Sequence, residues 1–103
     1  MTSPRLEKLE KLLAADPTDA FVLYGLAQEH AKLRDYTRAV EFYDRCLAAD
    51  AHYCYAYYHK AVALQAMGRV EDARGALAAG ITAAKAAGDQ KALGELGTML
   101  DAL

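Results

Sequence analysis

Tryptophan and asparagine are absent from the 103 residues of this chain, serine occurs once, and cysteine and proline occur twice each. Two cysteines are too few for a disulfide scaffold, and they indicate a reducing compartment. No apolar run approaches the roughly 18 residues that a membrane-spanning helix needs. The first eight residues are polar and already helical in pattern, so we expect no signal peptide. Together these absences predict a cytoplasmic protein.

The net charge is also small, because 12 Lys and Arg residues against 14 Asp and Glu residues leave −2 at pH 7 without a basic block. Electrostatic binding to nucleic acid or to a membrane surface needs a positive patch, so we expect neither partner. Apolar residues make up 54% of the chain and charged residues 25%, which is typical of a globular protein. The length fits one domain with a modest core.

Helical periodicity runs through the whole chain. Alanine is abundant and β-branched residues are scattered, which is typical of closely packed helices. Apolar residues recur at helical spacing in six segments that begin near residues 4, 19, 35, 53, 70 and 89. The fifth segment is expected to end at about Ala84. Residues suited to cap or end helices stand at the boundaries: Ser3, Thr18 or Asp19, Asp35, Gly68 and Gly88. Short connections make consecutive helices antiparallel, so the sequence predicts one all-α unit.

The strongest signal is an internal repeat with a period of 34 residues. This offset places the segment Ala39-x3-Tyr43 on Ala73-x3-Leu77, and it places Ala27 on Ala61. Small residues at equivalent positions predict where two helices approach closely, and the large apolar residues beside them fill the remaining space. One helical hairpin cannot bury its own apolar face, so repeats of this kind are stable only when they stack.

This repeated helix–turn–helix resembles the tetratricopeptide repeat, whose pattern runs W-x2-L-G-x2-Y…A-x3-F…P. The first helices of the two copies read Leu23-x2-Leu26-Ala27-x2-His30 and Tyr57-x2-Lys60-Ala61-x2-Leu64, so the second copy departs from the pattern at Lys60. The resemblance covers essentially the whole chain and implies an all-α superhelix with about two full repeats. Its parts would be a half-repeat helix (4–17), repeat 1 (20–53), repeat 2 (54–87) and a capping helix (89–103).

Members of this family line a concave groove with the first helix of each pair. The resemblance implies that the groove holds Phe21, Tyr24 and Gln28 from the first repeat, and Tyr55, Tyr58, His59, Val62 and Gln65 from the second. Tyrosine offers apolar area together with a hydroxyl group, which suits a surface that binds a protein or a peptide. The alternative interpretation is that these tyrosines merely cover an edge of a small domain.

One subclass of the family grips a C-terminal carboxylate with lysine and asparagine side chains in the groove. This chain has no asparagine, and Tyr24 and His59 occupy the matching groove positions. The pattern therefore disfavours that clamp. Lys32 and Lys60 are left as residues that could meet a partner's carboxylate in another geometry.

The sequence carries no catalytic constellation. Ser3 is the sole serine, and the glycines are dispersed rather than gathered in a phosphate-binding loop. Soft metal ligands lie near one another in sequence but lack the spacing of a zinc site; they are Cys46, His52, Cys54 and His59. Cys46 and His30 are interpreted as packed core residues. We therefore expect no catalytic residue, no cofactor and no metal site.

Two functions of different classes remain. The favoured hypothesis is a non-enzymatic interaction module that binds a protein or peptide segment in the tyrosine-rich groove. The alternative is a self-assembling structural protein, a homodimer or larger homo-oligomer joined through its terminal helices. Leu6, Leu9 and the leucines between 93 and 103 are expected to be only partly shielded, which supports this alternative.

Overall fold

The computed structural model describes residues 3–103 and contains six α-helices among them, with no strand in that range. They are α1 (Pro4–Ala15), α2 (Ala20–Lys32), α3 (Tyr36–Ala49), α4 (Cys54–Ala66), α5 (Val70–Ala87) and α6 (Gln90–Ala102). The all-α prediction is confirmed. The helix α5 is longer than predicted because its alanine-rich end favours helix, and it stops only where Gly88 adopts the left-handed conformation with φ 69°.

Four helices begin with a side-chain cap. Ser3, Asp19, Asp35 and Asp89 each accept a hydrogen bond from the backbone N–H three residues further on. Each bond satisfies one of the free N–H groups of a helix start. Of the two candidates considered for α2, Asp19 rather than Thr18 is the cap.

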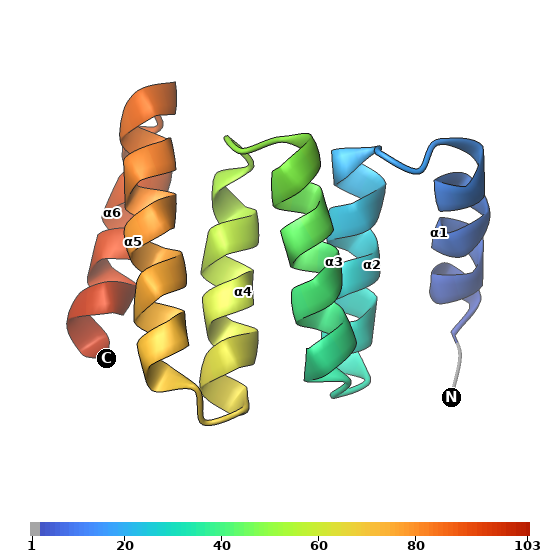
Figure 1. Cartoon of the computed structure of the whole chain (residues 1–103), viewed down its shortest axis with the longest axis horizontal. Helices are drawn as coiled ribbons and strands as arrows, with labels where there is room; N and C mark the ends of the chain where they lie inside the picture. Colours follow the sequence, from blue (N-terminus) through green and yellow to red (C-terminus); the bar gives the residue numbers. More distant parts are fainter. Residues whose placement is uncertain (1–2) are drawn as a thin grey trace.

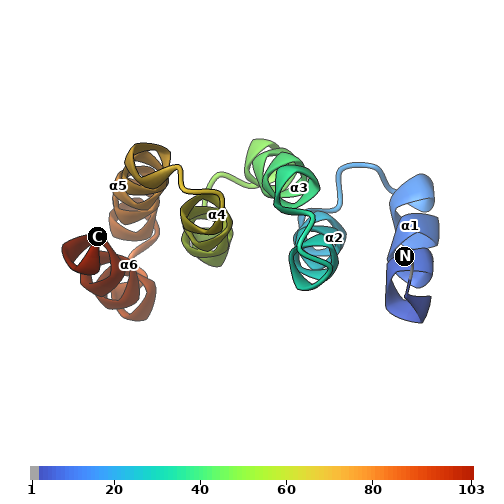
Figure 2. The ribbon, with the colours of Figure 1, turned by 90° about the horizontal axis from the view of Figure 1, so that it is seen from below.

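The helices form two layers (Figures 1 and 2). In one layer α4 contacts both α2 and α6, and the other layer holds α3 and α5. Consecutive helices run antiparallel, and α1 stands at one end of the molecule beside α2. In Figure 2 α4 lies closer to the layer of α3 and α5 than α2 and α6 do. The helices α2, α4 and α6 therefore line the concave side of a shallow curve.

Equivalent positions of the two repeats have equivalent environments. Ala27 and Ala61 are both completely buried, as are Ala39 and Ala73. The large apolar residue four positions after the second of these alanines is also buried in each copy: it is Tyr43 in the first repeat and Leu77 in the second. The 34-residue periodicity therefore marks the helix contacts that the sequence predicted.

The last helix repeats the pattern of α2 and α4. Its segment Leu93-x2-Leu96-Gly97-x2-Leu100 corresponds to the pattern that begins at Leu23 in α2. The three helices start at residues 20, 54 and 90, so the second interval is two residues longer than the first. That difference, which the extended α5 creates, hides the match at a fixed offset of 34. The segment predicted as a capping helix therefore matches, in sequence and in position, the helix that would open a third repeat.

Candidate functional site

The face formed by α2, α4 and α6 carries a group of aromatic side chains, here called the tyrosine cluster: Tyr24, Tyr43, Tyr53, Tyr58 and His59. Tyr24 is central, with its ring 4.8 Å from that of Tyr53 and 5.8 Å from that of His59. The rings of Tyr58 and His59 meet edge to face at 5.2 Å. Tyr43 is buried beneath them, and the other four side chains are half-buried.

Close packing between the helices positions these rings. Ala56 on α4 is fully buried and packs with Leu23 and Tyr43, so its small side chain lets α4 approach the first repeat. The side-chain amide of Gln28 donates a hydrogen bond of 3.0 Å to the hydroxyl oxygen of Tyr24. This contact fixes the polar edge of the central ring. The cluster is therefore preorganised, with one turn of α2 facing the start of α4.

Burial keeps Tyr24, Tyr43 and His59 of the cluster electrically neutral near pH 7. Burial, together with the neighbouring Tyr53, raises the pKa of Tyr24 to about 12. Burial likewise raises the pKa of Tyr43. Burial lowers the pKa of His59 below its ordinary value of 6.5, because the imidazolium form loses hydration. A surface of neutral rings with hydroxyl and imidazole groups suits apolar and uncharged polar ligands better than strongly charged ones.

Of the eight groove residues expected from the sequence, Tyr24, Gln28, Tyr58 and His59 lie within or against the cluster. Phe21 and Val62 project into solvent, with 70% and 42% of their surfaces exposed. Gln65 is also exposed. Tyr55 is half-buried and packs against the core shared by α4, α5 and α6, on the side of Glu95 of α6.

A shallow hollow of about 500 Å³ extends the face beyond Tyr58. Its other side is formed by α6, through Gly94, Glu95, Thr98, Met99 and Ala102. Sequence reasoning missed these residues because α6 was interpreted as a cap. Aligning Leu93 and Leu96 with Leu23 and Leu26 is the signal that would have placed α6 on this face.

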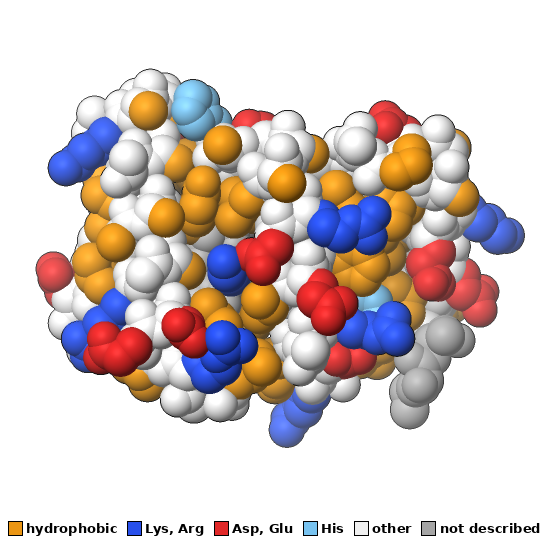
Figure 3. All heavy atoms as spheres, in the orientation of Figure 1, with side chains coloured by type: hydrophobic (Ala, Val, Ile, Leu, Met, Phe, Trp, Pro, Cys, Tyr) orange, Lys and Arg blue, Asp and Glu red, His pale blue; other side chains and the backbone are white. Residues whose placement is uncertain are grey.

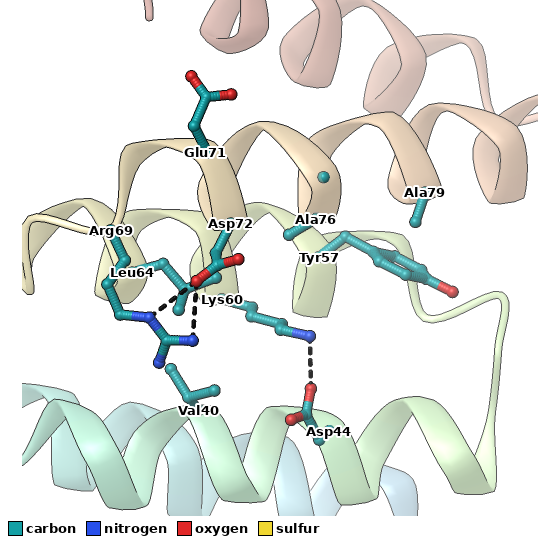
Figure 4. A pocket seen from close by; sticks show the side chains of 11 residues that line it. Val40, Asp44, Tyr57, Lys60, Leu64, Arg69, Glu71, Asp72, Ala76 and Ala79 are labelled. Carbon is teal, nitrogen blue, oxygen red and sulfur yellow. Dashed lines mark hydrogen bonds and ion pairs between the residues drawn. The ribbon is translucent and has the colours of Figure 1, made fainter.

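Lys60 lies on the opposite face, where it lines a second hollow of about 370 Å³ between α3 and α5 (Figure 4). Its Nζ is 2.6 Å from Oδ1 of Asp44. Lys32 in turn lies 3.3 Å from Oε1 of Glu29. Both lysines considered for a partner's carboxylate therefore contact carboxylates of the chain itself. Figure 3 shows this second face, where acidic and basic side chains alternate over hydrophobic ones.

The residues considered for metal binding or catalysis occupy packed positions. Cys46 is fully buried, and the Sγ of buried Cys54 donates a 3.3 Å hydrogen bond to the carbonyl of His52. His30 stacks on Phe42 at 5.4 Å. Within residues 3–103, no three His, Cys, Asp or Glu side chains are grouped so as to hold a metal ion. In the same range, no helix combines the length and apolar character needed to cross a membrane.

Antiparallel helix pairs with equivalent buried contacts, stacked in two layers, define a helical repeat protein. No family model matches the chain. It is 33% identical over 95 residues to the TPR repeat-containing protein PA0015 of Pseudomonas aeruginosa, a match that covers 92% of this chain and 90% of that relative. The chain therefore belongs to the tetratricopeptide repeat family, which confirms the resemblance read from its sequence.

Solved structures agree with this assignment. The crystal structure of a tetratricopeptide repeat domain protein from Salinibacter ruber is 35% identical, with a TM-score of 0.72, and the match covers 80% of this chain and 91% of that one. The crystal structure of PcrH in complex with the chaperone binding region of PopD has a TM-score of 0.87 at 21% identity, covering 94% of this chain and 74% of that one. The second likeness concerns the fold.

Proposed function

We propose that this protein is an interaction module that holds a segment of another protein against the face formed by α2, α4 and α6. The observation that carries the proposal is the tyrosine cluster, whose half-buried rings lie at the centre of this face beside the hollow next to Tyr58. Rigid aromatic side chains bind with little loss of conformational entropy, which makes them effective anchors in protein interfaces.

The shape and charge of the face define the segment that fits. The hollow between Tyr58 and Met99, about 500 Å³, has room for a short apolar stretch of the partner rather than a single side chain. The Tyr24 and Tyr53 hydroxyl groups and the His59 imidazole offer hydrogen bonds to the partner's backbone. Because the cluster is neutral, we infer a segment with apolar anchors rather than an acidic tail.

A structural neighbour supports a role of this class. PcrH, which shares the fold, is described in complex with the chaperone binding region of PopD. Since its sequence identity to this chain is 21%, it supports protein binding as a class of function and does not name the partner.

Site-specific photo-cross-linking in the native host tests the proposal. A photoreactive phenylalanine analogue at exposed Val62 reports on the face formed by α2, α4 and α6, and the same analogue at exposed Thr37 reports on α3. We expect protein adducts from position 62 that are absent from position 37. Tyr58→Ala removes one wall of the hollow and should reduce those adducts at least tenfold, because interface anchors of this kind contribute about 2 kcal/mol.

Tyr36→Ala is the matched control, because Tyr36 is a half-buried tyrosine on α3 outside the cluster. This variant should leave the adducts of position 62 unchanged. Circular dichroism must show that both alanine variants keep the helical content of the parent chain. Identical adducts from positions 37 and 62, or adducts that survive Tyr58→Ala, contradict the proposal.

A further inference from the structure

The helix α6 leaves partly exposed a stripe of positions that is buried in the first repeat and, apart from half-buried Tyr57, in the second. Leu93, Gly97 and Leu100 of α6 are partly exposed, whereas Leu23, Ala27 and His30 at the equivalent positions of α2 are buried. In the first repeat the second helix, α3, covers that stripe. A β-carbon added to Gly97 would meet no atom within 4 Å. Within residues 3–103, α6 is therefore a first helix whose stripe no second helix covers.

The helix α1 has the complementary property. Its positions Arg5, Lys8 and Leu12 precede Ala39, Phe42 and Cys46 of α3 by 34 residues. In α3 this side packs against α2, and both Ala39 and Cys46 are fully buried. In α1 all three side chains are exposed, and Leu12 retains 50% of its surface. Among the described residues, α1 is thus a second helix whose corresponding side no first helix covers.

We propose that a second copy of this chain covers the stripe on α6 with its own α1, so that the two half-units of neighbouring copies make one complete repeat. Repeat geometry would place Leu12 of one copy over Leu93 of the other, as Cys46 lies over Leu23. It would also place the backbone of α1 at Arg5 opposite Gly97, where the absence of a side chain leaves room, while the Arg5 side chain stays paired with Glu29 of its own α2 at 2.8 Å. Asp101, exposed beside Leu100, offers Lys8 a charge of opposite sign.

The two surfaces of this contact differ, so the association is head to tail. A head-to-tail contact leaves one free α1 and one free α6 at the ends of every assembly and therefore builds open chains. One joint between helices is smaller than a standard protein interface of about 1,600 Å², so the contact is weak and depends on concentration. Each joint would extend the layer of first helices by another copy.

Sedimentation velocity on the purified 103-residue chain tests the proposal between about 10 µM and about 1 mM, the range of weak interfaces. Leu12→Glu blocks only the α1 surface, and Gly97→Glu blocks only the α6 surface. Both residues are exposed enough to accept the change without a clash. We expect the parent chain to exceed twice the monomer mass as concentration rises, while each variant alone stays monomeric. An equimolar mixture should form a dimer with one copy of each variant, and nothing larger.

Other outcomes overturn the proposal. A parent chain that remains monomeric at 1 mM, or a Leu12→Glu variant that still associates through two copies of α6, excludes the head-to-tail joint. Circular dichroism confirms that both variants are folded, and Lys8→Glu provides a milder block of the α1 surface. Tyr58→Ala should leave the association unchanged, since Tyr58 lies on another face. The proposed function and this joint therefore fail independently.

Discussion

Gly80 on α5 lies so close to Tyr57 on α4 that a β-carbon at position 80 would stand 2.7 Å from the Tyr57 β-carbon and 3.1 Å from a methyl group of Leu96. Tyr57 occupies the place of Leu23 in the first repeat, where the facing residue is Cys46. The second repeat therefore combines a larger first-helix residue with a smaller second-helix residue. Because the larger side chain faces a smaller one, α4 and α5 can pack closely in the second repeat, as α2 and α3 do in the first.

Gly80→Ala should destabilise the fold. The added methyl group meets a side-chain stem that cannot move without shifting α4, and overpacking of this kind costs about 1–3 kcal/mol. Gly75→Ala is the matched control on the same helix, where a β-carbon meets nothing within 4 Å. It should stabilise the chain by about 0.5–1 kcal/mol, because alanine favours helix over glycine. Urea unfolding followed by circular dichroism measures both, and equal effects would contradict the close contact.

Arg34 and Gly68 occupy equivalent positions in the two repeats. They stand 34 residues apart, each just after a first helix, and both adopt positive φ values of 61° and 76°. An arginine in this conformation carries strain that glycine avoids. Arg34→Gly should raise the free energy of unfolding by about 0.5–1 kcal/mol, and Gly68→Arg should lower it by about 1 kcal/mol. Thermal unfolding of the two variants checks the opposite signs, and a loss of stability in Arg34→Gly would show that the side chain itself matters.

The ion pair between α1 and α2 should contribute more than a surface pair. Glu29 is 5% exposed, and its Oε1 lies 2.8 Å from Nε of Arg5. Arg5→Met leaves that buried carboxylate with exposed Lys32 alone, and we expect a loss of about 1–2 kcal/mol. Arg38→Met is the control, because Arg38 pairs with exposed Asp35 at 3.6 Å and should cost at most about 0.5 kcal/mol. Equal losses in urea unfolding would refute the distinction.

Lys60 occupies a position where the first repeat has the fully buried Leu26. Its side chain is 25% exposed and reaches Asp44 across the hollow between α3 and α5. Lys60→Leu replaces a partly desolvated ion pair by apolar packing, so stability should stay unchanged or rise by about 1 kcal/mol. Lys60→Ala, which also removes the packed stem, should lower it by about 1–2 kcal/mol. If Lys60→Leu is as destabilising as Lys60→Ala, the ion pair is what holds α4 to α3.

The stability of the fold should decline as pH falls through the range below 6.5. Burial lowers the pKa of His59 in the folded chain, so the unfolded chain binds the proton first. The folded state therefore loses stability from pH 6.5 downward until His59 is also protonated in the folded chain. Comparing the unfolding free energy of the parent with His59→Gln at pH 7.5 and at pH 5.5 isolates this contribution. The variant should lose less stability over that interval than the parent, and parallel pH profiles would contradict the assignment.

The periodicity of the sequence predicted much of the helical architecture. Small residues such as Ala27 and Ala39 identified the helix contacts, since small side chains there let two helices approach closely. The same reasoning missed the role of α6, because α5 is extended and the third first helix is out of register with a strict 34-residue period. Half of the expected groove residues lie in or against the tyrosine cluster. Exposure of Phe21 and Val62 depends on neighbouring helices that no local pattern describes.

By itself, the amino-acid sequence determined the helices, their caps and the spacing of their contacts, because these follow from local propensity and from periodic placement of small and large side chains. Tertiary structure decided which aromatic rings meet, that Lys60 turns away from them, and which helical sides stay uncovered. Those features arise from the packing angle and offset between elements far apart in the chain. Such quantities are set by the summed contacts of many residues and are not encoded at any single position.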